Sequence, residues 1–218
     1  NTGASKSWFF FDDEIVCLGN VSSKSNRSVY TTVNQCWYNE DNSYFIDNSN
    51  INHHIKKNTI YNDSIKYILN DGIGYLFPQG GNVIIDNQEK KGCWYDINKT
   101  SSEQEIKGDV ITISLDHGVN PSNNSYSYII LPKMKSKEQI REYINKNNIE
   151  VVANNNRIQS VYNHNLKIWY VVFFDAGNLS FNGMTIDVDK GCLLMIKELN
   201  RNLIKLSIVE PTQSKQSI

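Results

Sequence analysis

The feature that most constrains this chain is a strict alternation of apolar and polar residues on both sides of a polar segment. Ile111, Ile113 and Leu115 alternate with polar residues, and the segment 126–130 (YSYII) repeats the two-residue period with Tyr126, Tyr128 and Ile130. This period places alternate side chains on one face of a strand. The residues between them, 116–124 (DHGVNPSNN), favour turns. The stretch 109–132 therefore predicts two antiparallel strands joined by a long, polar, exposed loop.

Short apolar runs continue along most of the chain. Turn residues separate them about every 8–12 residues, as is typical of β-sandwiches. The fold class is therefore predicted to be all-β and antiparallel. Further predicted strands are 8–11, 15–19, 29–33, 74–77, 83–85, 93–97, 149–153, 158–162, 166–174, 184–188, 192–199 and 203–209.

One short helix is predicted, over about residues 136–147. Ser136 and Gln139 have the spacing of a capping box. Ile140, Tyr143 and Ile144 fall on one face of such a helix. The Asn-Asn pair that begins at Asn147 is expected to end it.

The clearest strands also predict which side chains form the core. Their period-2 placement indicates that one set of alternating residues faces the inside of the sandwich. The predicted core residues are Trp8, Phe10, Ile111, Ile113, Tyr128 and Ile130.

Length and charge exclude several classes of protein. A chain of 218 residues is long enough to bury a substantial core. Its net charge of -1 gives no indication of a nucleic-acid partner. No apolar run approaches the roughly 20 residues of a membrane span. Residue 1 is Asn rather than Met, and an apolar run begins at Trp8, so we expect a processed chain or a piece of a longer one.

The four cysteines, Cys17, Cys36, Cys93 and Cys192, fit no Cys-x-x-Cys metal pattern. Disulfide pairing is possible in an extracellular β-protein, and buried free thiols are the favoured alternative. No metal site and no cofactor are predicted.

No catalytic residue is predicted in this chain. Asp116 and His117 are adjacent in sequence, so their side chains point to opposite sides of a strand, and no Gly-x-Ser-x-Gly motif supplies a nucleophile. The His53-His54 pair has the wrong spacing for two ligands on one strand face. The run 12–14 (DDE) is expected to form a solvent-exposed turn. Asp187 and Asp189 share a face but are expected to be a solvated strand end.

Three tryptophans are candidates for stacking on a sugar ring, although aromatic residues in alternating strands more often belong to the core. Trp169 lies in a continuous apolar run and is expected to be buried, and Trp94 is expected in the core as well. Trp37 lies in a polar stretch beside Asn34 and Gln35. Trp37 is therefore the best candidate for ligand contact.

Several segments together resemble a known family. The segments 6–19 (KSWFFFDDEIVCLG), 29–35 (VYTTVNQ), 71–78 (DGIGYLFP), 114–132 and 154–163 (NNNRIQSVYN) follow the order found in the central β-domain of polysaccharide lyase family 8. The segment 192–213 is similar to the start of that family's smaller C-terminal β-domain. The resemblance implies an antiparallel super-sandwich, with residues 1–180 as the central domain and residues 181–218 as the start of the next domain.

The resemblance also implies a function. Members of the family cleave uronic-acid polysaccharides by β-elimination, and their catalytic Asn, His, Tyr and Arg lie in an upstream helical domain. It therefore implies a secreted lyase acting on hyaluronan or chondroitin, with xanthan second, whose helical catalytic domain is the partner of this segment.

Within the segment, the resemblance points to Asn34 and Gln35 as residues that face the substrate cleft, and Trp37 is added because it lies beside them in the polar stretch. They follow a strand predicted to end at Val33. The family often has an acidic residue and an Arg in this stretch, where this sequence has Asn34 and Cys36. The alternative interpretations are that Asn34 and Gln35 cap a turn or bridge to the helical domain, and that the chain is a non-catalytic carbohydrate-binding or structural β-module.

Overall fold

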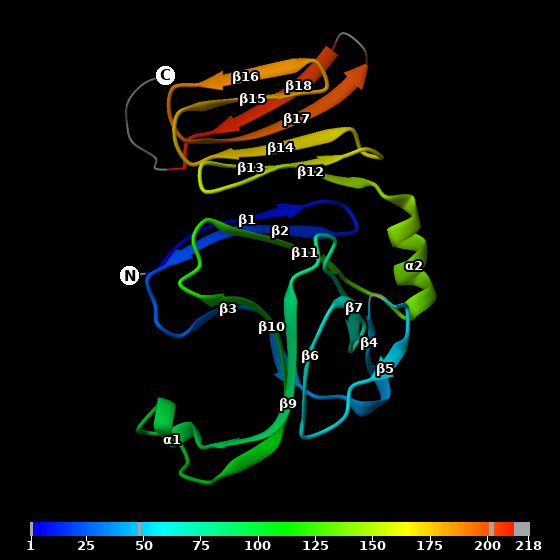
Figure 1. The fold of residues 1–218 in the computed structure, drawn as a ribbon, viewed down its shortest axis with the longest axis vertical. Coiled ribbons are helices and arrows are strands. Elements are labelled where there is room, and N and C mark those ends of the chain that lie inside the picture. The colour runs from blue at the N-terminus through cyan, green and yellow to red at the C-terminus, as the bar shows by residue number, and fades with distance from the viewer. Residues whose placement is uncertain (1, 48, 201–202, 212–218) are drawn as a thin grey trace.

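The computed structural model describes residues 2–47, 49–200 and 203–211 and shows a stack of β-layers (Figure 1). The described strands form a four-stranded sheet (β3-β10-β9-β6), a seven-stranded sheet (β1-β2-β11-β8-β7-β4-β5), a five-stranded sheet (β12-β13-β14-β17-β18) and the hairpin β15-β16. Every strand pair in these sheets is antiparallel. The prediction of an all-β antiparallel super-sandwich is confirmed.

The bounds of the elements are as follows. The first three sheet-forming segments are β1 (Thr2–Phe10), β2 (Ile15–Ser23) and β3 (Ser28–Trp37), and the 3-10 turn η1 (Glu40–Asn42) follows. Next come β4 (Ser43–Asp47), β5 (Asn52–His54), β6 (Thr59–Asp63), β7 (Ile65–Asn70), β8 (Ile73–Leu76), β9 (Asn82–Gly92), the helix α1 (Trp94–Ile97), β10 (Ile106–Val119) and β11 (Asn124–Leu131). After the helix α2 (Lys137–Lys146) come β12 (Ile149–Asn154), β13 (Ile158–Asn163), β14 (Ile168–Phe173), β15 (Gly177–Phe181), β16 (Met184–Val188), β17 (Cys192–Asn200) and β18 (Leu203–Val209).

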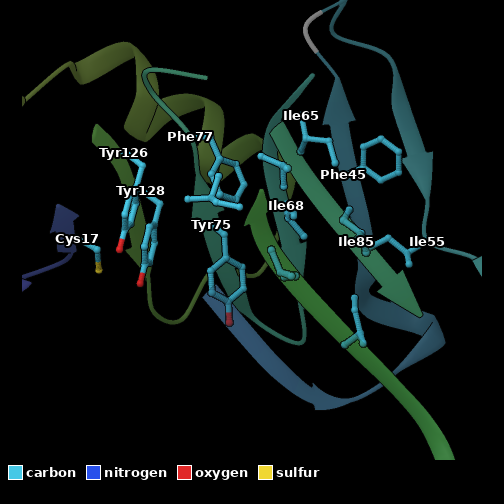
Figure 2. Packing of buried hydrophobic residues seen from close by; sticks show 14 of the residues in the cluster. Cys17, Phe45, Ile55, Ile65, Ile68, Tyr75, Phe77, Ile85, Tyr126 and Tyr128 are labelled. Atoms are coloured by element: carbon cyan, nitrogen blue, oxygen red, sulfur yellow. The ribbon is translucent and has the colours of Figure 1, made fainter. Parts of the chain in front are cut away.

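The first core fills the space between the four-stranded and seven-stranded sheets. Ile111 and Ile113 of β10 are fully buried there, and Tyr128 of β11 is 6% exposed, so these three core predictions are confirmed. Ile130 is half-buried at the margin of the same cluster. Figure 2 shows how Tyr126 and Tyr128 lie beside each other near Cys17, while the aliphatic side chains gather around Phe45.

A second core joins the other face of the seven-stranded sheet to the five-stranded sheet and to α2. α2 contributes the buried Ile140 and the half-buried Tyr143 and Ile144, as its apolar spacing predicted. The Ser136 hydroxyl accepts a bond from the Gln139 backbone N–H at 3.4 Å. The helix ends at Asn147, whose φ of 46° lies in the left-handed region. The predicted helix and its cap are confirmed.

A third core lies between the five-stranded sheet and the β15-β16 hairpin, centred on the buried Trp169. Strands from both sides of residue 180 contribute to this sheet and its hairpin. Residues 180 and 181, between which the domain boundary is expected, both lie in β15. Residues 212–218 of the expected second domain lie outside the described residues.

The two strands of segment 109–132 are present, but they do not pair with each other. β10 pairs with β3 and β9, whereas β11 pairs with β2 and β8 in the other sheet. Asp116 and His117 belong to β10, so the connection is residues 120–123 only. The prediction that a long polar loop joins these two strands as one antiparallel unit was wrong, because alternation identifies strands but not their partners.

The prediction that Trp8 and Phe10 lie in the core was also wrong. They are 54% and 64% exposed, whereas Phe9 between them is 4% exposed. β1 is the edge strand of the seven-stranded sheet, and the four-stranded sheet opposite is narrower. Trp8 and Phe10 therefore face the side of the first core without being covered by it.

Candidate functional site

The candidate site lies along β3, which forms the edge of the four-stranded sheet (Figure 1). This strand continues to Trp37 instead of ending at Val33. Ser114 pairs with Thr32 and Ile113 pairs with Asn34, so Val33 is the extra residue of a β-bulge. The bulge interrupts the apolar alternation, which explains why the sequence suggested a strand end.

Gln35 and Trp37 share the outward face of this sheet. They pair with Thr112 and Val110 of β10, whose neighbour Ile111 points into the core. Residues directly opposite each other in an antiparallel pair have their side chains on the same face. The Gln35 side-chain amide donates to the Thr112 hydroxyl at 3.0 Å, which fixes the amide in an exposed position.

The Trp37 indole lies against Gly108 of the neighbouring strand. Trp37 is 64% exposed, and a Cβ placed on Gly108 would lie 2.5 Å from the Cζ3 atom of its ring. The absence of a side chain at Gly108 therefore leaves the space that the six-membered ring of the indole occupies. The exposed remainder of the ring is a pre-oriented surface on which an apolar face of a sugar ring can stack.

Asn34 lies on the opposite face. It pairs with the buried Ile113, and its side-chain amide donates to the Cys36 sulfur at 3.4 Å. The Asn70 amide donates to the same sulfur at 3.2 Å. The structure therefore groups Gln35 with Trp37 and separates Asn34 from both, because neighbouring strand residues alternate between faces.

Trp94 is a second exposed aromatic residue in this region, and the expectation that it belongs to the core was wrong. Residues predicted as a strand, 93–97, form the short helix α1, where Trp94 is 58% exposed. Trp37, Trp94, Ile97 and Ile106 line a shallow apolar hollow of about 240 Å³. Trp169, by contrast, is fully buried as predicted, and its indole N–H donates to the Ser160 hydroxyl at 2.7 Å.

Comparison with known proteins identifies the family. Residues 1–144 match the super-sandwich domain of polysaccharide lyase family 8, and residues 150–218 match the C-terminal β-sandwich domain of the same family. The chain belongs to polysaccharide lyase family 8.

The relatives include lyases of different specificity. This family 8 chain is 37% identical over 215 residues to a chondroitinase-AC of Pedobacter heparinus. The aligned region covers 98% of the chain and 30% of the relative. It is 30% identical over 196 residues to a hyaluronate lyase of Thermasporomyces composti, covering 88% of the chain and 25% of the relative. A xanthan lyase of a Bacillus species is 29% identical over 98% of the chain and 24% of the relative.

Solved structures of the family have the same fold. A chondroitinase AC lyase in complex with oligosaccharides superposes with a TM-score of 0.87 at 35% identity, covering 98% of this chain and 31% of that chain. A Paenibacillus xanthan lyase superposes with a TM-score of 0.86 at 27% identity, covering 98% of this chain and 21% of that chain. The chain thus spans less than a third of the length of each of these lyases.

The histidines of this family 8 chain have structural partners. The imidazole Nε2 of His117 lies 2.8 Å from the Thr31 hydroxyl, and the ring packs on Tyr126 with the ring centroids 4.7 Å apart. Burial lowers the pKa of His117. One Asp116 carboxylate oxygen accepts from the Gly118 N–H at 2.8 Å, so Asp116 does not orient the imidazole. His53 bonds to Asp47 at 3.0 Å and stacks on Phe45.

The remaining candidates are the cysteines and the possible metal ligands. No group of three or more His, Cys, Asp or Glu residues in the described parts of the chain is arranged to hold a metal ion. All four cysteines are free, and burial raises the pKa of the Cys17 thiol to about 12. Neither α1 nor α2, the helices of the described residues, is long and apolar enough to cross a membrane.

The acidic turn between β1 and β2 contains one unexpected residue. Asp12 and Asp13 are exposed, as predicted, but Glu14 is only 6% exposed. The Asn163 amide of β13 donates to the Glu14 carboxylate at 2.8 Å. Burial, with a further contribution from the charge of Asp13, raises the pKa of Glu14. The expectation that all three carboxylates point to solvent was therefore wrong for Glu14, which connects the β1–β2 turn of the seven-stranded sheet to β13 of the five-stranded sheet.

Proposed function

We propose that this chain is the β-sandwich portion of a polysaccharide lyase that degrades a uronic-acid polysaccharide by β-elimination. The observation that carries the proposal is the match to chondroitinase-AC at 37% identity over 98% of the chain. Chondroitin or hyaluronan is the proposed substrate, with xanthan second. The parent enzyme is proposed to be secreted and to need no cofactor.

The acid–base steps are assigned to the rest of the parent enzyme. In β-elimination, an amide neutralises the uronate carboxylate and thereby acidifies the C5 proton. A His or Tyr base removes that proton, and a Tyr protonates the leaving oxygen. We assign these roles to the upstream helical domain, because His117 and His53 of this chain are engaged with Thr31 and Asp47. The chain alone is therefore proposed to be inactive.

The proposed contribution of this chain is a substrate-facing surface on β3. Gln35 presents a neutral amide, which binds a sugar hydroxyl or a carboxylate without adding charge. Trp37 presents an exposed indole held against Gly108. Asn34 is half-buried and donates to the Cys36 sulfur, so we do not assign it to direct contact with the saccharide.

Turnover by the parent enzyme tests this assignment. Trp37→Ala is expected to lower kcat/KM by about tenfold or more, equivalent to about 1.4 kcal/mol of transition-state stabilisation. Gln35→Ala is expected to lower it less, and Asn34→Ala is expected to change thermal stability together with activity. Ultraviolet absorbance of the unsaturated uronate product measures the rate. Gln104→Ala, which removes an exposed amide elsewhere, is the matched control.

Two outcomes would contradict the proposal. Parental kcat and KM in both Gln35→Ala and Trp37→Ala would remove these residues from the substrate surface. Clear turnover of hyaluronan or chondroitin sulfate by pure chain 1–218 would show that the catalytic groups lie within it. A parent gene that encodes no amphipathic helices upstream would favour the alternative, a non-catalytic carbohydrate-binding or structural β-module.

A further inference from the structure

Two exposed aromatic residues of β3 lie on the same face of the four-stranded sheet, although their sequence spacing predicts opposite faces. Tyr30 and Trp37 are an odd number of residues apart, and strict alternation would separate them. The β-bulge at Val33 adds one residue to β3 and shifts the alternation. As a result, Tyr30 lies opposite Asp116 and Trp37 lies opposite Val110, which are on the same face of β10.

Burial shows that this shared face points away from the first core. Leu115 and Ile111 of β10, which alternate with the partners of the two aromatic residues, belong to that core. Tyr30 is 53% exposed, and Trp37 is exposed to a similar extent. The bulge therefore gives the outward face of β3 a second aromatic ring in addition to the indole.

Neutral polar side chains occupy the outward face of β3 between the two rings. Thr32 and Gln35 are both exposed, and they lie opposite Ser114 and Thr112 of β10. The Gln35 amide donates to the Thr112 hydroxyl at 3.0 Å. An amide also has a second N–H and a carbonyl oxygen, and a threonine hydroxyl both donates and accepts. These groups suit the hydroxyl groups of a sugar.

The two rings are too far apart to stack on one sugar ring. Their partners, Asp116 and Val110, lie about six residues apart along β10, which corresponds to roughly 20 Å. Exposed rings at both ends of a polar strip suit an extended ligand of several sugar rings, because each aromatic ring can stack on one apolar sugar face. The strip is part of a paired strand, so little entropy is lost in ordering it.

A basic residue lies at the Trp37 end of the strip. Lys90 of β9 is directly opposite Gly108, against which the indole lies, so the ammonium group and the indole share the outward face. The Lys90 ammonium is 3.6 Å from the Asp86 carboxylate, in an exposed position where such an ion pair is weak and a ligand carboxylate can compete for it. None of the described residues that line the adjacent hollow is acidic. This end therefore favours a carboxylate of the ligand.

The Tyr30 end has a different charge. The Asp116 carboxylate, opposite Tyr30, accepts from the Gly118 N–H at 2.8 Å and from the Asn82 amide at 3.4 Å. A second carboxylate is not favoured next to it. We therefore expect this end to contribute stacking on a sugar ring and no contact with a uronate carboxylate.

We propose that the outward face of β3 is a binding track for an extended uronic-acid oligosaccharide. One sugar ring stacks on Trp37 with its carboxylate near Lys90, and a ring further along the same oligosaccharide stacks on Tyr30. The proposal rests on the proposed function for its ligand class. It goes beyond that function by assigning Tyr30 and Lys90 and by requiring a ligand long enough to reach both aromatic rings.

Steady-state kinetics of the parent enzyme with size-defined, unsulfated hyaluronan oligosaccharides test the track. Tyr30→Ala is expected to raise KM about three- to tenfold for octasaccharides and longer substrates, with kcat unchanged. The effect is expected to stay below about twofold for the shortest oligosaccharide that is cleaved, because that ligand reaches only the Trp37 end. Tyr30→Phe keeps the ring and is expected to behave like the parent.

Two further variants complete the test. Lys90→Gln is expected to raise KM for substrates of every length, and less so at high ionic strength, because salt screens the lysine in the parent. Phe174→Ala, which removes an exposed ring after β14 in another sheet, is the matched control and is expected to leave KM unchanged at every length. Thermal unfolding of Tyr30→Ala is expected to match the parent, because the side chain is exposed.

The outcomes separate the track from the proposed function. If Trp37→Ala impairs turnover while Tyr30→Ala has no effect, or the same effect at every substrate length, the track is overturned and the proposed function stands. Parental kinetics in both Gln35→Ala and Trp37→Ala would contradict the proposed substrate surface and the track together. A parental KM in Lys90→Gln at low ionic strength would overturn the assigned carboxylate contact.

Discussion

β1 and β10 have the same kind of sequence pattern and very different surroundings. In β10, Ile111 and Ile113 alternate with polar residues and are fully buried. In β1, Trp8 and Phe10 have the same two-residue spacing and are more than half exposed. Their cross-strand partners, Cys17 and Ile15, contact the first core. Trp8 and Phe10 therefore lie on the face of β1 that is turned toward the first core, as the alternation predicted.

The difference lies in the layer opposite each strand. β10 is an interior strand of the four-stranded sheet, paired on both sides, and its inner face lies against the seven-stranded sheet. β1 is the edge strand of the wider sheet. Alternation therefore determines which side chains share a face, whereas burial depends on how far the opposing sheet extends, which is a long-range property.

The largest expected effect comes from the fully buried side of this comparison. Ile113→Ala removes a side chain with no exposed surface and leaves a cavity between the two sheets. We expect a loss of about 2–5 kcal/mol in the free energy of unfolding. Urea denaturation followed by fluorescence measures it, and a loss under about 0.5 kcal/mol would show that β10 packs less tightly than the structure indicates.

The next effect contrasts two glycines at different depths of the same sheet. A Cβ on Gly19 of β2 would lie 2.1 Å from the ring of Tyr126, which packs on His117, whereas a Cβ on Gly3 of β1 meets no atom within 4 Å. Gly19→Ala must displace a buried ring, so we expect a loss of about 1–3 kcal/mol. Gly3→Ala is the control and is expected to stay within about 0.5 kcal/mol. Equal stability of the two variants would mean that Tyr126 moves aside freely.

Much of the fold follows from local patterns in the sequence. The alternation in β10 and β11, the cap at Ser136 and the apolar face of α2 are short-range properties, and each predicted the element that the structure contains. The pairing of β10 with β3 and β9 is not local, because residues 120–123 carry the chain to another sheet. Turn residues predict that the chain changes direction, but they do not indicate which sheet the next strand joins.

The candidate site shows a second reason for incomplete prediction. Trp37 was singled out because its neighbours are polar, and it is indeed exposed. Asn34 and Gln35 were grouped because they are adjacent, although adjacency on a strand places them on opposite faces. The bulge at Val33 interrupts the alternation, so the continuation of β3 to Trp37 was not predicted. The amino-acid composition around Val33 does not indicate a bulge. Trp94 was expected in the core because 93–97 was predicted to be a strand, whereas these residues form the connection α1 and leave it 58% exposed.

A pH effect is expected at the turn that joins β1 to β2. The pKa of Glu14 is raised above its ordinary value of 4.5 by burial. The native state therefore binds its proton more tightly than the unfolded state does, and the corresponding stabilisation is present at acidic pH and is lost as the pH rises through the raised pKa. Glu14→Gln removes the ionisation and can still accept from Asn163. Its stability relative to the parent is expected to increase from about pH 4 to about pH 8.

The matched control for this pH effect is Asp12→Asn, because Asp12 lies in the same turn and is exposed. Its stability relative to the parent is expected to change little over the same range. Thermal unfolding of both variants across the pH series provides the measurement. A relative stability of Glu14→Gln that is flat with pH would mean that the carboxylate is solvated in the native state.

The smallest effect is expected on the uncovered face of β1. Phe10 has a large aromatic ring and an apparently ideal core position in the sequence, but 64% of it is exposed. The bond that the Tyr170 hydroxyl donates to Phe10, at 3.4 Å, goes to the backbone carbonyl, so truncation of the side chain leaves it in place. Phe10→Ala is therefore expected to lower the free energy of unfolding by less than about 1 kcal/mol, mainly through the lower strand propensity of alanine.

The measurement is urea denaturation of Phe10→Ala alongside Ile113→Ala under the same conditions. If Phe10→Ala costs as much as Ile113→Ala, then β1 is covered in solution and the contrast between the two strands disappears. If Phe10→Ala lowers the free energy of unfolding only slightly in chain 1–218 but strongly in the parent enzyme, the rest of the polypeptide covers Phe10. It would then supply the covering layer that the narrower four-stranded sheet does not provide.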